Sequence, residues 1–180
     1  MALSSTIYHF EIQLSDVDRG VYETLSLKAA CHPSESTENL AVRVLAYCLE
    51  YTEGLSFSRG ISEPDEPALS VRDLTGTLRA WIDTGSPVAA RLHKASKAAP
   101  RVAVYTHKAP AAFLKSLAGE KIHRADALEL YAFESDFIAG FVKRIERRTR
   151  IELSVTDRTL YLSVAGETLS GVVSKLDLPQ

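Results

Sequence analysis

The residues best suited to chemistry lie in the stretch 56–87. Asp65 precedes one run of strand-like residues and Asp83 ends the next, and Asp73–Gly76 between them has the composition of a hairpin turn. In an antiparallel hairpin the beginning of the first strand lies beside the end of the second, so both carboxylates are expected at one end of a sheet. Two carboxylates at one point repel unless a cation or a shared proton relieves them. The spacing therefore predicts a site for Mg²⁺ or Mn²⁺ held by Asp65 and Asp83, with water and substrate phosphate completing the ligands.

Ordinary turn formation explains the same acids without a metal. Asp65 follows Pro64 and precedes Pro67 by two positions, and Asp83 stands shortly before Gly85. Acidic residues beside proline and glycine commonly shape loops. From the spacing alone, both interpretations stay open.

A helix before the hairpin offers a third acid. Residues 33–53 begin with serines and acids that suit a helix N-terminus, and Gly54 predicts the helix end. The apolar stripe of this helix, extended back by one turn, reaches Glu38. Glu38 is thus expected either at the same corner as the two aspartates or as an exposed acid that stabilises the helix terminus.

A second helix follows the hairpin and supplies cations. Ser86 is expected as its cap and Pro87 as its first residue, with the helix ending near Ala99. Arg91 and Lys94 are three positions apart and therefore share one face. They are expected either to reach the acidic site or to form a solvated face.

The remaining pattern predicts a single α/β domain over residues 1–180, with a mixed β-sheet flanked by helices. Alternation of polar and apolar residues predicts strands, and period-3.6 patterns predict helices. The expected strands are 6–14, 21–29, 55–61, 101–106, 127–133, 151–155, 159–164 and 169–176, and the further expected helices are 110–117 and 136–148.

Charge and cysteine content limit the function classes. The 180 residues carry a formal net charge of −2, which excludes bulk coating of nucleic acid and requires any such binding to use a local basic surface. One basic cluster, at the end of the helix expected over 136–148, would either stabilise the helix terminus or contact phosphates; its members are Lys143, Arg144, Arg147, Arg148 and Arg150. Cys31 and Cys48 lack metal-site spacing, and no apolar leader or membrane-length apolar run is present, so a cytoplasmic protein with free thiols is expected, monomeric by default and without a membrane partner.

Four stretches carry a resemblance to a known family: 32–35 (HPSE), 65–67 (DEP), 81–85 (WIDTG) and 91–95 (RLHKA). Over essentially its whole length the chain resembles the bacterial YaeQ family. That family resembles the restriction-endonuclease-like fold, whose nuclease signature is written PD-(D/E)xK. The resemblance implies a core of helix, three strands, helix and strand, with additional N- and C-terminal strands.

Carried over to this chain, the resemblance assigns roles to individual residues. Pro64-Asp65 matches the first element and Asp83 the second acid, but Gly85 stands where the lysine is expected. Lys94 is the candidate for a displaced lysine and Lys97 is second. Glu38 would correspond to the acid that many members supply from the first core helix.

The implied function is metal-assisted hydrolysis of phosphodiester bonds in DNA or RNA. Asp65 and Asp83 would hold Mg²⁺ or Mn²⁺, and Lys94 would orient water or stabilise the transition state. Glu38 would bind the metal directly or orient one of its ligands. The alternative is a noncatalytic nucleic-acid- or protein-binding module that keeps the fold without the chemistry, because a fold alone does not establish activity.

Overall fold

Ten strands form one mixed sheet in the computed structural model, which describes residues 4–58 and 65–179. The strands lie side by side in the order β2-β1-β8-β9-β10-β7-β6-β5-β4-β3. The pairs β1–β8, β5–β6 and β6–β7 are parallel and the other pairs are antiparallel. The strands are β1 (Thr6–Asp16), β2 (Val21–Cys31), β3 (Leu55–Phe57), β4 (Leu69–Arg72), β5 (Leu78–Thr84), β6 (Arg101–Thr106), β7 (Glu129–Phe133), β8 (Arg148–Thr156), β9 (Thr159–Val164) and β10 (Glu167–Leu176).

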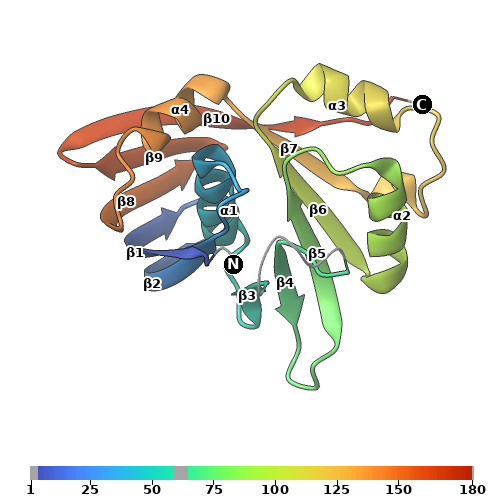
Figure 1. Ribbon diagram of the computed structural model, residues 1–180, viewed down its shortest axis with the longest axis horizontal. Helices are drawn as coiled ribbons and strands as arrows, with labels where there is room; N and C mark the ends of the chain where they lie inside the picture. Colours follow the sequence, from blue (N-terminus) through green and yellow to red (C-terminus); the bar gives the residue numbers. More distant parts are fainter. Residues whose placement is uncertain (1–3, 59–64, 180) are drawn as a thin grey trace.

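Strand β10 joins two halves of this sheet. Its residues 167–172 pair with β9, and residues 173–176 pair with β7. The two halves diverge from this junction and enclose helix α1 between them (Figure 1). The predicted mixed α/β class is therefore confirmed, but the sheet wraps around a helix where a sheet flanked by helices was expected.

Helix α1 (Thr37–Glu50) is buried on nearly all sides. Ser36 caps it by accepting a hydrogen bond from the backbone N–H of Asn39 at 3.1 Å. Apolar residues face both halves of the sheet, so most of the helix contributes to one core. Two charged residues on this buried helix, Arg43 and Glu50, are each paired with an opposite charge, as burial of a charge requires.

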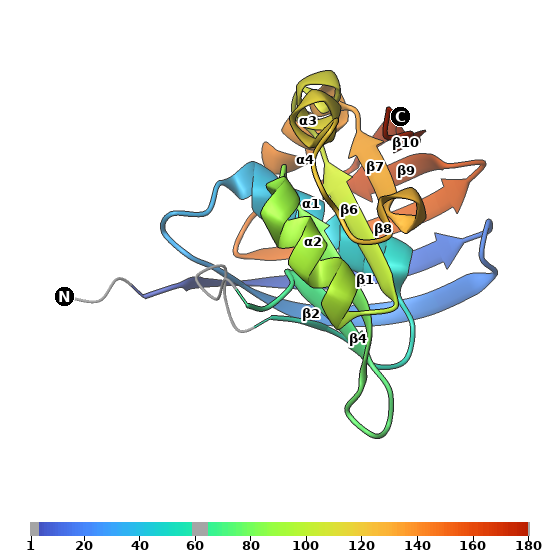
Figure 2. The ribbon, with the colours of Figure 1, turned by 90° about the vertical axis from the view of Figure 1, so that its right-hand side faces the viewer.

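Two further helices cover the outer face of the half of the sheet that contains β5 and β6 (Figures 1 and 2). Helix α2 (Ala89–Ala98) packs on β5 and β6, and α3 (Pro110–Leu117) adds Phe113 and Leu117 to the second, smaller core that these elements form with β7. A short 3₁₀ turn, η1 (Ala125–Ala127), precedes β7. Helix α4 (Ser135–Val142) lies against α1 and β10, and Gly171 allows this contact because a Cβ there would lie within 2.6 Å of the Phe137 ring.

Two expected helix ends and one expected strand end were wrong. Helix α1 ends at Glu50 rather than near Glu53. Helix α2 begins after Val88, whose carbonyl accepts the first helical hydrogen bonds from the N–H groups of Arg91 and Leu92, so neither Ser86 nor Pro87 has its expected capping role. The short strand expected over 55–61 ends at Phe57, and its last residues, 59–61, lie outside the described residues.

The expected helix 136–148 was too long. Helix α4 ends at Val142, and β8 begins at Arg148 with every second residue turned inward. The Thr149 hydroxyl bonds to the backbone N–H and carbonyl of Glu146 and so fixes the turn between them. Lys143 is the C-cap of α4, and Arg144 donates to the Gly140 carbonyl of its last turn at 2.7 Å, so the expected role at the helix terminus holds for these two residues. Arg148 and Arg150 instead belong to β8.

The helix-to-strand order α1, β3, β4, β5, α2, β6 is the order expected for the core. Strands β4 and β5 form the expected antiparallel hairpin, in which Leu69 pairs with Ile82. None of the helices in residues 4–58 and 65–179 is long and apolar enough to cross a bilayer.

Candidate functional site

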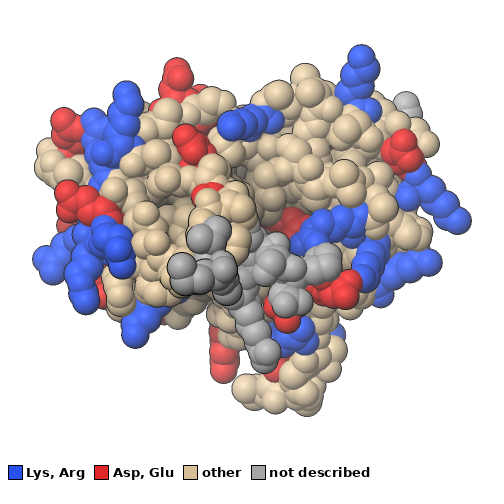
Figure 3. All heavy atoms as spheres, viewed as in Figure 1, with Lys and Arg blue, Asp and Glu red and all other residues tan. Residues whose placement is uncertain are grey.

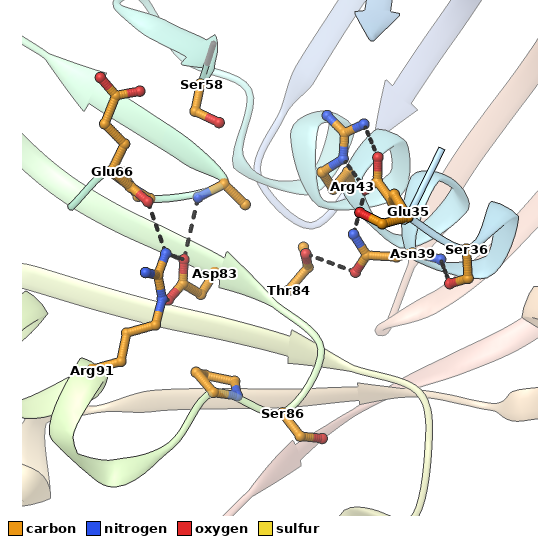
Figure 4. Close-up of a pocket in the computed structure, with 14 residues that line it drawn as sticks. Glu35, Ser36, Asn39, Arg43, Ser58, Glu66, Asp83, Thr84, Ser86 and Arg91 are labelled. Atoms are coloured by element: carbon orange, nitrogen blue, oxygen red, sulfur yellow. Dashed lines mark hydrogen bonds and ion pairs between the residues drawn. The ribbon is translucent and has the colours of Figure 1, made fainter. Parts of the chain in front are cut away.

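A polar pocket lies at the carboxyl end of β5, between the first turn of α1 and the first turn of α2 (Figure 4). It encloses about 470 Å³. Its lining includes two ion pairs, one on each side, together with hydroxyl side chains. The lining residues are Ser34, Glu35, Ser36, Asn39, Arg43, Ser58, Glu66, Pro67, Ala68, Asp83, Thr84, Ser86, Pro87 and Arg91.

Asp83 is the buried acid on the α2 side of this pocket, with only 2% of its surface exposed. Residues alternate between the two faces of β5, so Asp83 faces α2 while Thr84 faces α1. One carboxylate oxygen, Oδ1, accepts a hydrogen bond from the backbone N–H of Ala68 at 3.2 Å. The hairpin geometry thus places Asp83 beside the segment that begins with Asp65.

Arg91 neutralises Asp83. Its Nε lies 2.7 Å from Oδ2, and its Nη2 lies 3.0 Å from Oδ1 and 2.8 Å from the backbone oxygen of Glu66. The guanidinium stands over the Trp81 ring at 5.3 Å from its centroid. A planar guanidinium matches a carboxylate in this two-point geometry, so Arg91 holds α2, β5 and the segment before β4 together.

Asp65 and Lys94 form a second pair outside the pocket. The ammonium of Lys94 donates to Oδ1 of Asp65, and both side chains are mostly exposed, at 59% and 72%. Lys94, and to a smaller extent Arg91, lower the pKa of Asp65 below its ordinary value. Asp65 and Asp83 are therefore held by cations one helical turn apart on α2.

Glu35 is the acid on the α1 side, and the sequence pattern did not single it out. Arg43 approaches it with Nε at 2.7 Å and Nη2 at 2.9 Å, and Nη2 also donates to the Ala30 carbonyl at 2.8 Å. Asn39 donates its amide N–H to the same carboxylate and accepts from the Thr84 hydroxyl at 3.0 Å. This network ties the start of α1 to the end of β5.

Glu38 and Lys97 are not among the described residues that line the pocket. Burial, and next Lys108, lower the pKa of His107, and the charge of Glu38 partly opposes this shift. Lys97 lies near His93, whose pKa is lowered by desolvation and then by Lys97. The structure thus pairs Asp83 with Arg91 in the pocket and Asp65 with Lys94 outside it, and it places neither Glu38 nor Lys97 in the pocket lining.

A family model described as YaeQ protein matches residues 1–172. The chain belongs to the YaeQ family. The YaeQ protein of Escherichia coli (strain K12) is 30% identical over 164 residues, 91% of each chain, and that of Salmonella typhi is 29% identical over 170 residues, 94% of each chain. Both of these relatives are described as uncharacterized proteins.

Two solved structures of YaeQ proteins share the fold. The crystal structure from Pseudomonas syringae has a TM-score of 0.87 at 30% identity, over 96% of each chain. The structure from Xanthomonas axonopodis pv. citri has a TM-score of 0.85 at 30% identity, over 98% of this chain and 100% of the other. The expected family resemblance is confirmed, and it covers both the sheet and the pocket region.

In this YaeQ-family chain Gly85 cannot provide the lysine of the nuclease signature. Its φ of +86° belongs to the left-handed region that favours glycine. Its N–H donates to the Tyr105 carbonyl at 2.9 Å and so anchors the end of β5 to β6. The positive charge beside Asp83 comes from Arg91 on α2.

The donor chemistry of Asp83 and Asp65 suits a hard cation, although the pairs must rearrange to admit one. Among the described residues no group of three His, Cys, Asp or Glu side chains converges. Mg²⁺ needs only one or two protein carboxylates when water and phosphate supply the rest. Asp83 is paired with Arg91 and Asp65 with Lys94, both on α2. A divalent cation would have to replace these two side chains.

Proposed function

We propose that this chain is a metal-dependent phosphodiesterase acting on DNA or RNA, with Asp83 at the centre of its site. The observation that carries the proposal is the position of Asp83, a buried carboxylate in a polar pocket that is paired with Arg91. A second acid–cation pair, Asp65–Lys94, lies one turn further along α2. Buried, charge-coupled acids in a cleft are candidates for function. Mg²⁺ or Mn²⁺ held by Asp83 and Asp65 would polarise the phosphodiester and activate water.

Arg91 and Lys94 provide the positive charge that the missing lysine would have supplied. A guanidinium binds phosphate oxygens in the same two-point geometry in which Arg91 binds Asp83. Lys94 lies one turn further along α2 and carries a flexible ammonium at the surface. Both side chains can therefore exchange a carboxylate partner for a phosphate oxygen of the substrate, which stabilises negative charge in the transition state.

Glu35 takes the place that was expected for Glu38. It lies in the pocket wall opposite Asp83, fixed by Arg43 (Figure 4). Through Asn39 it orients the hydroxyl of Thr84, the residue that follows Asp83 on β5. Glu35 is thus a positioning residue for the end of β5.

The order of core elements supports a restriction-endonuclease-like core, with β1, β2 and β7–β10 as additions. In that fold the hairpin β4–β5 would carry the two acids and α2 the cations. We further propose a cytoplasmic location and a monomer, consistent with two unpaired cysteines among the described residues.

A noncatalytic binding module is the second candidate, and one observation favours it. The oxygens of Asp83 are already engaged by Arg91 and the Ala68 N–H, and Gly85 has no side chain to offer. A protein that had lost the chemistry would retain such pairs for their structural value. The pocket would then bind nucleic acid or protein without cleaving it.

Hydrolysis of bis(p-nitrophenyl) phosphate, with and without Mn²⁺, separates the two candidates. We expect Mn²⁺-dependent hydrolysis that falls at least about 100-fold in Asp83→Asn, the order found when a charged stabilising group is removed. The matched control is Asp126→Asn, an exposed acid of η1, which should hydrolyse at the parent rate. Equal rates in the parent and Asp83→Asn, or no hydrolysis in the parent, would reject the enzyme in favour of the module.

A further inference from the structure

The outer face of β2, β1 and β8 carries a row of basic side chains in register. His9 of β1 lies opposite Lys28 of β2 on one side and Arg148 of β8 on the other. Neighbouring strands are about 4.8 Å apart, so the row spans about 10 Å. Arg150 lies two residues after Arg148 on the same face, opposite Glu11. We name Lys28, His9, Arg148 and Arg150 the basic sheet face.

Most of this positive charge points into solvent. In β8 the residues alternate strictly, so that Arg148 and Arg150 are exposed while Thr149 and Ile151 are buried. Within residues 4–58 and 65–179, neither Arg148, Arg150 nor Lys28 belongs to an ion pair. Such cations keep their charge available for an outside partner.

Two acids also lie on this face, Glu11 on its middle strand and Glu152 in the following row. Glu11 is the residue between Arg150 and Ser26 in the register, and its carboxylate accepts the Ser26 hydroxyl at 2.7 Å. Glu152 follows one row further, opposite Gln13. The first two rows therefore hold three permanent cations and His9 against one acid, although the whole chain has a net charge of −2.

No described helix covers the basic sheet face. The opposite face of the same strands packs on the core through Phe10, Leu27 and Ile151, and α1 and α4 lie on that inner side (Figure 1). Several Lys and Arg side chains, with Asp and Glu side chains among them, lie at the left margin of the molecule, over β1, β2 and β8 (Figure 3). Beyond the cations the face continues with small polar side chains and two exposed tyrosines, Tyr22 and Tyr161, at 63% and 46%.

We infer that the basic sheet face docks the phosphate backbone of a nucleic acid. Its cations are spaced by one strand or by two residues, about 5–7 Å, so that each can meet a different phosphate of a polymer. A single phosphate would contact only one or two of them. Hydroxyl side chains beside the row suit phosphate and sugar oxygens, and exposed tyrosines suit stacked bases.

This inference rests on the proposed function in one respect, which is that the polyanion is taken to be a nucleic acid. It implies that the substrate is a polymer rather than a mononucleotide. The basic sheet face and the pocket use different strands, β1, β2 and β8 in one case and β4 and β5 in the other. The face therefore binds without chemistry, and the pocket acts on small phosphodiesters without the face.

Fluorescence anisotropy with a labelled duplex and a labelled single strand of about 20 nucleotides tests the inference, the length being enough to cover all four residues of the basic sheet face. The variant is Arg148→Glu with Arg150→Glu, both exposed on a strand. The matched control is Lys115→Glu with Lys121→Glu, which changes the net charge equally on exposed positions around α3. Lys28→Glu, in the same row on β2, replaces the double variant if that one fails to fold, as judged by thermal melting.

We expect the double variant to bind at least about tenfold more weakly than the parent, with a shallower dependence on salt, because each lost phosphate contact reduces the salt slope by roughly one unit. The control should bind within about twofold of the parent, as expected when bulk charge is a minor contribution. Equal weakening in variant and control, or unchanged binding in the variant, would overturn the inference. So would binding to phosphatidylserine vesicles that is lost in the variant while nucleic-acid binding is retained.

The same variants separate this inference from the proposed function. Hydrolysis of bis(p-nitrophenyl) phosphate should be unchanged in Arg148→Glu with Arg150→Glu, because that substrate is too small to reach both sites. A parent protein that binds nucleic acid through the basic sheet face but hydrolyses nothing would reject the enzyme and leave the docking surface standing. A parent protein that hydrolyses the small substrate but binds the duplex and the single strand no better than the double variant does would reject the docking surface and leave the enzyme standing.

Discussion

Arg91 binds both oxygens of the Asp83 carboxylate, with its Nε 2.7 Å from Oδ2 and its Nη2 3.0 Å from Oδ1. The pair joins α2 to the end of β5, and a further bond to the Glu66 carbonyl extends it to the segment before β4. The cation of α2 that reaches the buried acid is therefore Arg91, while Lys94 reaches the exposed Asp65. This arrangement decides which substitutions affect stability and which affect only charge.

Arg91→Ala should lower the free energy of unfolding by about 3 kcal/mol, because it leaves the Asp83 carboxylate buried without a charged partner. Urea unfolding followed by circular dichroism measures the loss. Asp83→Asn combined with Arg91→Ala should recover part of it, since the uncompensated charge is then gone. Arg79→Ala, at an exposed position of β5, is the control and should stay within about 0.5 kcal/mol of the parent. A loss no larger than that of the control would show that the pair contributes nothing.

Glu35→Gln should destabilise the fold strongly, whereas Glu38→Gln should not. Arg43 is only 5% exposed, so removing the charge of its partner leaves a buried guanidinium uncompensated, at a cost of about 3–5 kcal/mol. Glu38 lies three residues away and has no such partner among the described ion pairs. The same urea measurement compares the two variants directly, and equal losses would mean that the Glu35–Arg43 pair has no special weight.

Lys94→Ala should raise the pKa of Asp65 toward its ordinary value. The Lys94 ammonium is the main reason that this pKa is lowered, and Arg91 contributes less. Because the folded-state pKa is depressed, the pair stabilises the protein above the ordinary pKa of Asp and stops doing so as the pH falls through the lowered value. The carboxyl ¹³C shift of Asp65, followed by NMR between neutral and acidic pH, gives the midpoint. A midpoint that does not move in Lys94→Ala would mean that the ion pair is not formed in solution.

The two cysteines should differ in reactivity. Burial raises the pKa of the Cys48 thiol to about 12, and it is fully inaccessible inside α1. The pKa of Cys31 is also raised, by burial and by Glu35, but this thiol is only half-buried. Since the thiolate is the reactive form, iodoacetamide at mildly alkaline pH should label Cys31 slowly and Cys48 only after unfolding. Mass spectrometry of native and denatured samples measures both rates, and equal native labelling would contradict the buried position of Cys48.

The hairpin that carries the site was predictable because its signals are local. Alternation on both sides of Asp73–Gly76 predicts two strands and a turn, and antiparallel pairing then places Asp83 beside the start of β4. The cation assignment was not predictable in the same way. Arg91 and Lys94 share a helix face, and only the packing of α2 on Trp81 determines which of them meets the buried acid.

Glu35 was missed because helical periodicity does not extend beyond the cap. Ser36 is the N-cap at which α1 begins, so Glu35 lies in the turn before the helix, where the helical periodicity that led to Glu38 does not apply. A usable signal was Arg43, a charged residue on a helix whose neighbours are otherwise apolar, which requires an acidic partner nearby. The early end of α4 was not predicted either. The helical spacing of Phe137, Phe141 and Ile145 is followed without a break by the alternating pattern of β8, so periodicity does not mark the end of the helix.

Anomalous diffraction from crystals soaked with Mn²⁺ and thymidine 5′-monophosphate tests the central proposal most directly. We predict an anomalous peak within roughly 2.5 Å of a carboxylate oxygen of Asp83, the distance of a direct ligand. The Arg91 guanidinium should then have left both Asp83 oxygens and should contact the phosphate. No peak near Asp83 or Asp65, with Arg91 still bound to both oxygens of Asp83, would contradict a metal-dependent phosphodiesterase at this site.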